Sequence, residues 1–103
     1  MKLTRKKAIA ISIELWTSLA ETGKHKWDWG GWRKYGLMAA YCPFCEFSAQ
    51  QEGMGCDSCP YYQEFGDCVD DTPYRLWCNA ETEEERKKYA KEFLAQLLYL
   101  KGE

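Results

Sequence analysis

The stretch "TEEERKKYAKEFLAQLLYLK", residues 82–101, carries the clearest structural signal in the chain. Thr82 and Glu85 have the spacing of a capping box, and further acidic residues lie where the positive end of a helix dipole favours them. Apolar residues then recur at helical spacing, namely Ala90, Phe93, Leu94, Leu97 and Leu98. The sequence therefore predicts a C-terminal helix over residues 82–101, with an apolar face that needs a partner.

A second long helix is predicted over residues 4–22, at the other end of the chain. Gly23 follows this segment and is suited to end a helix, because glycine readily adopts the left-handed conformation. The apolar positions form a broad stripe that covers most of the circumference: Ile9, Ile11, Ile13, Leu15, Trp16, Leu19 and Ala20. Such a helix should be largely buried, and we expect the two terminal helices to pack against each other.

Length and composition favour a small, mainly α-helical protein. A chain of 103 residues corresponds to one domain, residues 1–103, and 46% hydrophobic residues argue against disorder. Between the terminal helices we expect an irregular, aromatic-rich middle segment folded across one end of the helix pair. It comprises an aromatic segment, 24–41, and a zinc-binding region, 42–68, with short helices near 32–39 and 74–78. A core this small favours a staple such as a metal ion.

Two CxxC pairs in the stretch "YCPFCEFSAQQEGMGCDSCPYY", residues 41–62, supply the candidate staple. Paired thiolates can close a tetrahedron around one zinc ion, and such a site is structural because it leaves no coordination position open. The predicted ligands are Cys42, Cys45, Cys56 and Cys59. Cys68 is a substitute ligand, for example in a site made of Cys42, Cys45, Cys59 and Cys68.

Other uses of the cysteines stay open. The CPFC pair matches dithiol oxidoreductases, but that fold requires a preceding strand and a βαβ pattern, which the sequence lacks. The six cysteines could also form three disulfides in any of fifteen pairings. We interpret Cys78, beside Trp77, as a buried thiol. His25 lies far from the cysteines along the chain and is left out of the metal site.

Charge and motifs narrow the function classes. A net charge of −2 disfavours binding to double-stranded nucleic acid. The sequence shows no signal peptide pattern and no apolar run that could span a membrane, so we expect a cytoplasmic, reducing setting. The motifs of zinc deaminases, of GxSxG hydrolases, of HExxH proteases and of Walker-loop enzymes are missing, so we expect a non-enzymatic protein.

The stretch "KHKWDWGGWRKYG", residues 24–36, is the candidate binding surface. It concentrates the residue types that dominate protein-binding hot spots, and its glycines should keep some rings out of regular structure. Two further classes fit the same composition: capture of a small anionic ligand such as a nucleotide signal, and binding of single-stranded nucleic acid. The rings could equally fill the core. The candidate binding residues are Lys24, Lys26, Trp27, Trp29, Trp32, Arg33 and Tyr35.

The order of these motifs resembles that of small cysteine-rich proteins encoded by bacteriophages and prophages. The resemblance lies in "WGGWRKYG", "CPFCEF", "CDSCP", Cys68 and "RLWCNAETEEERKKYAKEFLAQL", and it covers nearly the whole chain. It implies no particular activity. It does imply a setting in the cytoplasm of an infected or lysogenic bacterium and a partner that is a host protein, as for an inhibitor or counter-defence factor.

Overall fold

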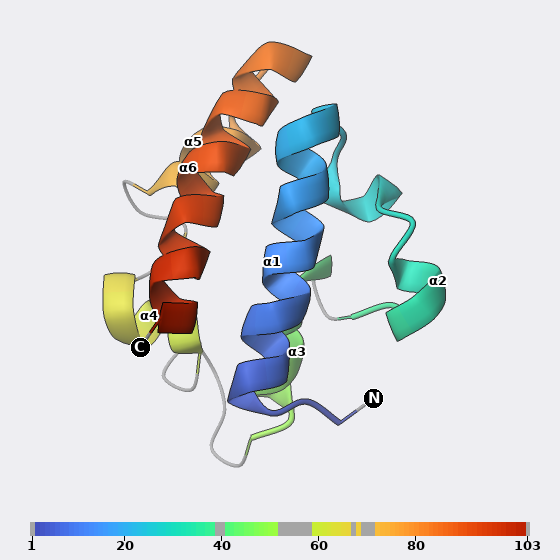
Figure 1. The fold of residues 1–103 in the computed structure, drawn as a ribbon, viewed down its shortest axis with the longest axis vertical. Coiled ribbons are helices and arrows are strands. Elements are labelled where there is room, and N and C mark those ends of the chain that lie inside the picture. The colour runs from blue at the N-terminus through green and yellow to red at the C-terminus, as the bar shows by residue number, and fades with distance from the viewer. Residues whose placement is uncertain (1, 39–40, 52–58, 67, 69–71, 103) are drawn as a thin grey trace.

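The computed structural model describes residues 2–38, 41–51, 59–66, 68 and 72–102, and these are mainly helical, with no strand among them (Figure 1). Within these ranges, no helix has the length and apolar character needed to cross a membrane. The elements are α1 (Arg5–Thr22), the 3₁₀ turn η1 (Lys26–Asp28), α2 (Trp32–Tyr35), α3 (Pro43–Ala49), α4 (Pro60–Phe65), α5 (Pro73–Cys78) and α6 (Glu83–Gly102).

Helix α1 begins and ends where its sequence predicts. The Thr4 side chain accepts a hydrogen bond of 3.1 Å from the backbone N–H of Lys7 and so caps the first turn. Gly23 ends the helix with a φ of 71°, and its N–H donates to the carbonyl oxygen of Leu19 at 2.9 Å. The predicted burial of this helix is confirmed, since eight of its residues are buried: Ala8, Ile9, Ile11, Ser12, Leu15, Trp16, Leu19 and Ala20.

Helix α6 is also confirmed, but its buried face differs from the predicted one. The buried residues are Ala90, Phe93, Leu97 and Leu100, which lie three or four positions apart. Leu94 is half-buried and Leu98 is 50% exposed. Each of these two leucines follows a buried residue by one position, about 100° further around the helix. The predicted face was therefore too wide on that side, and it omitted Leu100.

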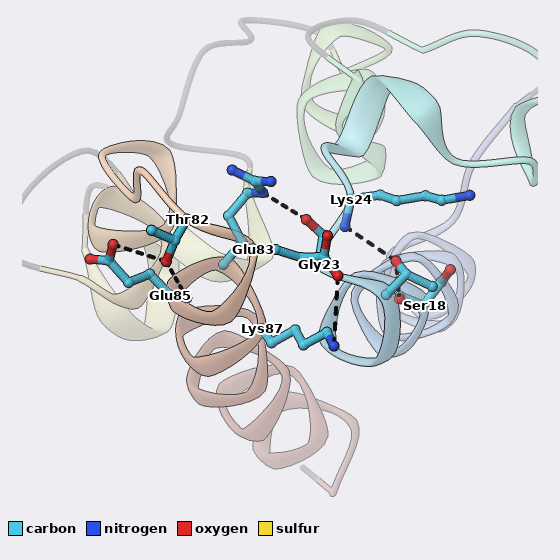
Figure 2. A network of polar contacts seen from close by, with 9 residues as sticks. Ser18, Gly23, Lys24, Thr82, Glu83, Glu85 and Lys87 are labelled. Atoms are coloured by element: carbon cyan, nitrogen blue, oxygen red, sulfur yellow. Dashed lines mark hydrogen bonds and ion pairs between the residues drawn. The ribbon is translucent and has the colours of Figure 1, made fainter.

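Helices α1 and α6 lie side by side and run in opposite directions, as expected for the terminal pair (Figure 1). The Trp16 ring of α1 meets the Phe93 ring of α6 edge-on, with their centroids 4.6 Å apart. At the junction shown in Figure 2, Thr82 Oγ1 accepts from the backbone N–H of Glu85 at 3.1 Å. Arg86 Nε donates a hydrogen bond to the Gly23 carbonyl oxygen at 2.6 Å. A side chain of α6 therefore supplies a hydrogen-bond donor to a carbonyl group at the C-terminal end of α1.

The middle segment is more regular than predicted, because it contains helices α3 and α4 as well as α5. Each begins at the same local signal, a residue in extended conformation followed by proline: Cys42 before Pro43, Cys59 before Pro60, and Thr72 before Pro73. Proline is favoured at the first position of a helix, since its fixed φ is helical and it lacks the N–H that would stay unpaired there.

The middle segment also lies in a different place from the one predicted. Helix α3 packs against α1, whereas α4 and α5 pack against α6 (Figure 1). The segment therefore packs along both long helices instead of across one end. The predicted helix near 32–39 is shorter than expected, because Gly36, with a φ of 80°, ends α2 directly after Tyr35.

Candidate functional site

Four cysteines line a single cavity of about 370 Å³ between the long helices and the middle segment. They are Cys42, Cys45, Cys59 and Cys68. The rest of the wall is mostly aromatic, with Trp16 of α1, Phe93 of α6 and Tyr74 of α5 among its members. Three stretches that are separate in the sequence thus contribute thiols to one place in the fold.

The local structure explains how two of these thiols are positioned. Cys42 is the N-cap of α3, and its Sγ accepts a hydrogen bond from the backbone N–H of Cys45 at 3.4 Å. Cys59 is the N-cap of α4, in extended conformation. Cys68 is held from the next segment, because Thr72 Oγ1 donates to its carbonyl oxygen at 2.6 Å.

The thiols of Cys42 and Cys45 influence each other's protonation. A hydrogen bond between the two thiol groups, followed by burial, raises the pKa of Cys42 well above its usual value. The same hydrogen bond lowers the pKa of Cys45, and the Lys26 ammonium adds a smaller effect in that direction. Cys59 and Cys68 are close enough to oppose ionisation of Cys45. Cys45 therefore ionises more readily than Cys42, and a neighbouring positive charge favours the ionised form of either thiol.

Among the residues that the structure describes, no three metal-ligating side chains are close enough together to hold an ion as they stand. Of the predicted ligands, Cys42, Cys45 and Cys59 reach the cavity, together with the substitute Cys68. Cys56 lies outside the described residues. Cys78 is exposed at the end of α5, so the interpretation of it as a buried thiol is wrong, although Trp77 beside it is buried.

Lys26 lies in the candidate binding segment, but its side chain points inward. It is only 9% exposed and lines the same cavity as the cysteines. Its ammonium donates a hydrogen bond to the Tyr74 hydroxyl and lies 4.9 Å from the centre of that ring. Burial raises the pKa of Tyr74, so the phenol is neutral and supplies no negative charge to Lys26.

The rest of the candidate binding segment is divided between core and surface. Trp32 is buried at 7% exposure, and its indole N–H donates to the Lys26 carbonyl oxygen at 2.8 Å. Trp29 and Tyr35 are half-buried, and Trp29 packs so closely over Gly31 that a Cβ there would collide with its ring. Lys26 and Trp32 are therefore unavailable as surface anchors in this conformation.

Among the candidate binding residues, three are exposed: Lys24, Trp27 and Arg33. Trp27 is 52% exposed, yet its ring is held by a parallel stack on His25 at 4.4 Å between centroids. The His25 ring in turn meets Trp77 of α5 edge-on at 6.2 Å. A large exposed ring with a fixed orientation is the kind of residue that anchors protein interfaces.

Sequence reasoning missed two hydroxyl groups that line the cavity. Ser12 and Ser48 are 1% and 6% exposed, and within the described residues neither Oγ atom has a hydrogen-bond partner. Ser12 carried a usable signal, because it is a polar residue between the buried Ile11 and Leu15 of the α1 stripe. Buried polar groups of this kind ordinarily have a partner.

Comparison with known proteins supplies no relative: no protein-family model matches the chain, and no curated protein or solved structure is significantly similar to it. The function of the chain must therefore be inferred from its own residues and their geometry.

Proposed function

We propose that this chain is a non-enzymatic binding protein stabilised by one structural zinc ion, held by Cys42, Cys45, Cys59 and Cys68. The observation that supports this most is the meeting of these four cysteines at one cavity, from three separate stretches of the chain. Four thiolates are a preferred ligand set for structural zinc, and they leave no position open for a water molecule or a substrate.

Zinc binding on this proposal draws the four sulfur atoms inward. Moving a side chain away from its preferred rotamer costs about 0.5–1.5 kcal/mol, whereas structural zinc contributes about 10–16 kcal/mol at neutral pH. The metal can therefore offset the adjustment of all four side chains. Because α3 packs on α1 while α4 packs on α6, such a centre would tie the middle segment to both long helices.

The ligand set is tested by the zinc content of single Cys→Ser variants purified under reducing conditions. Cys45→Ser and Cys68→Ser should lose zinc, whereas Cys56→Ser and the exposed control Cys78→Ser should keep it. Loss of zinc in Cys56→Ser with retention in Cys68→Ser would instead support the set Cys42, Cys45, Cys56 and Cys59. Full retention in every variant would contradict a cysteine site altogether.

The binding activity on this proposal belongs to the exposed part of the segment 24–36, and the partner is a host protein of a bacterium infected by a phage. Trp27 supplies the anchor, with Lys24 and Arg33 as flanking cations. Trp27→Ala should weaken capture of the partner by about 1–2 kcal/mol or more while zinc content stays unchanged. Leu98→Ala is the matched control, since Leu98 is a similarly exposed apolar residue on α6. Equal capture by both variants would place the binding surface elsewhere.

A second candidate function, capture of a small anionic ligand, is favoured by the polar groups of the cavity. The Lys26 ammonium and the hydroxyls of Ser12 and Ser48 line a mostly aromatic wall, which is the composition of many small-molecule sites. A thermal-shift screen of the zinc-loaded protein against nucleotides tests it. A saturable rise in melting temperature that Ser12→Ala reduces would support ligand capture, and a flat response would exclude the nucleotides tested.

A further inference from the structure

Lys26 is a buried cation that lacks a carboxylate partner in the described part of the chain. An ion pair on the surface of α6 joins Lys87 to Glu83 and does not involve Lys26. The Lys26 ammonium donates a hydrogen bond to the Tyr74 hydroxyl and lies near the Tyr74 ring, and this phenol is neutral. Burying an ammonium without a compensating negative charge costs several kcal/mol. A source of negative charge in the same cavity would remove much of that cost.

The cysteines supply a negative charge once they bind a divalent ion. A zinc ion with four thiolates keeps an excess of negative charge, because the thiolates outnumber the charges on the metal. Groups around such a centre tune it strongly, and removing one typically weakens metal binding 10–100-fold. Lys26 lines the same cavity as all four cysteines, so its ammonium faces the place where the zinc–thiolate charge would lie.

We infer that Lys26 is the counter-charge of the zinc–thiolate centre and that, through it, zinc occupancy holds the segment 24–36 in place. This inference rests on the proposed zinc site. The backbone of Lys26 provides the link: its carbonyl oxygen accepts the hydrogen bond from the buried Trp32 indole. Trp27 is the next residue along, in the same 3₁₀ turn. A change in the position of Lys26 therefore moves the ring proposed to bind the partner.

Three variants separate the charge of Lys26 from its packing. Lys26→Met keeps an unbranched side chain without the charge, Lys26→Arg keeps the charge, and Lys24→Met removes an exposed charge two residues away. The measurement is the rate at which a competing chelator removes zinc from each purified protein. We expect Lys26→Met to lose zinc at least tenfold faster than the wild type, and Lys26→Arg and Lys24→Met to stay within about threefold of it.

Equal rates for Lys26→Met and the wild type would overturn the inference while leaving the zinc site intact. A wild-type protein that binds no zinc would overturn both the inference and the proposed function. If Lys26→Met fails to fold, Lys26→Arg still tests the inference, because this variant keeps the positive charge. A tenfold faster loss of zinc from Lys26→Arg than from the wild type would contradict the inference.

Limited digestion of the wild type with trypsin tests the link to the segment directly. The bond after Lys26 should be protected in the zinc-loaded protein and cut after chelation, whereas the bond after the exposed Lys24 should be cut in both states. We expect cleavage after Lys26 to appear before the helical circular dichroism signal falls. If the two events coincide, or if Lys26 stays protected after zinc is removed, the link between zinc and the segment is wrong.

Discussion

Replacing Leu97 with alanine tests the packing of α6 on α1. Leu97 is fully buried, Leu94 is half-buried and Leu98 is 50% exposed. The same helix therefore carries three leucines that differ in how deeply they are buried. Leu97→Ala should lower the free energy of unfolding by about 2–5 kcal/mol, since it removes buried methyl groups and leaves a cavity. Leu94→Ala should cost about half as much, and Leu98→Ala about 1 kcal/mol or less.

These differences are large for a protein of this size, because small domains are stable by only about 5–15 kcal/mol. For about 100 residues, the loss in Leu97→Ala corresponds to a fall in melting temperature of roughly 8–20 °C. Urea unfolding followed by far-ultraviolet circular dichroism, with excess zinc in every sample, measures all three variants. An unchanged midpoint for Leu97→Ala, or an equal loss for Leu98→Ala, would refute this arrangement of the helix pair.

Three further changes test the junction in Figure 2 by the same unfolding assay. Gly23→Ala should lower the free energy of unfolding by more than about 1 kcal/mol, because φ is 71° there and the new Cβ would clash with the Glu83 side chain. An unchanged free energy of unfolding would contradict the close contact of the two helix ends. Thr82→Ala should cost about 1 kcal/mol through loss of the cap on α6, and Thr82→Ser should recover most of it. Arg86→Met should cost about 1.5 kcal/mol, because it leaves the Gly23 carbonyl unpaired, whereas the exposed control Lys88→Met should cost less than about 0.5 kcal/mol.

The two long helices could be predicted from the sequence because their signals are local. Thr4 and Gly23 mark the ends of α1, and Thr82 marks the start of α6, all within a few residues of the helices concerned. Helices α3 and α4 were missed because the surrounding glycines and cysteines are typical of loops. The Cys–Pro steps at residues 42 and 59 carried the missing information. The short helix predicted at 74–78 is present as α5, which begins one residue earlier, at Pro73.

The candidate site was predictable only in part. The CxxC spacing identified thiols that reach one cavity, but spacing alone does not decide between Cys56 and Cys68. The inward turn of Lys26 depends on Tyr74, 48 residues further along the chain, so no local pattern reveals it. Composition likewise grouped Trp27 with Trp32, although tertiary packing leaves the first exposed and buries the second.

The central claim, a structural zinc ion held by cysteines, is tested most directly by native mass spectrometry of the wild-type protein purified under reducing conditions. The predicted result is a mass that includes about one zinc ion per chain, with all six cysteines reduced once the metal is removed. A metal-free chain whose mass shows three disulfides would contradict the claim, as would a reduced, folded chain that takes up no zinc when the ion is added.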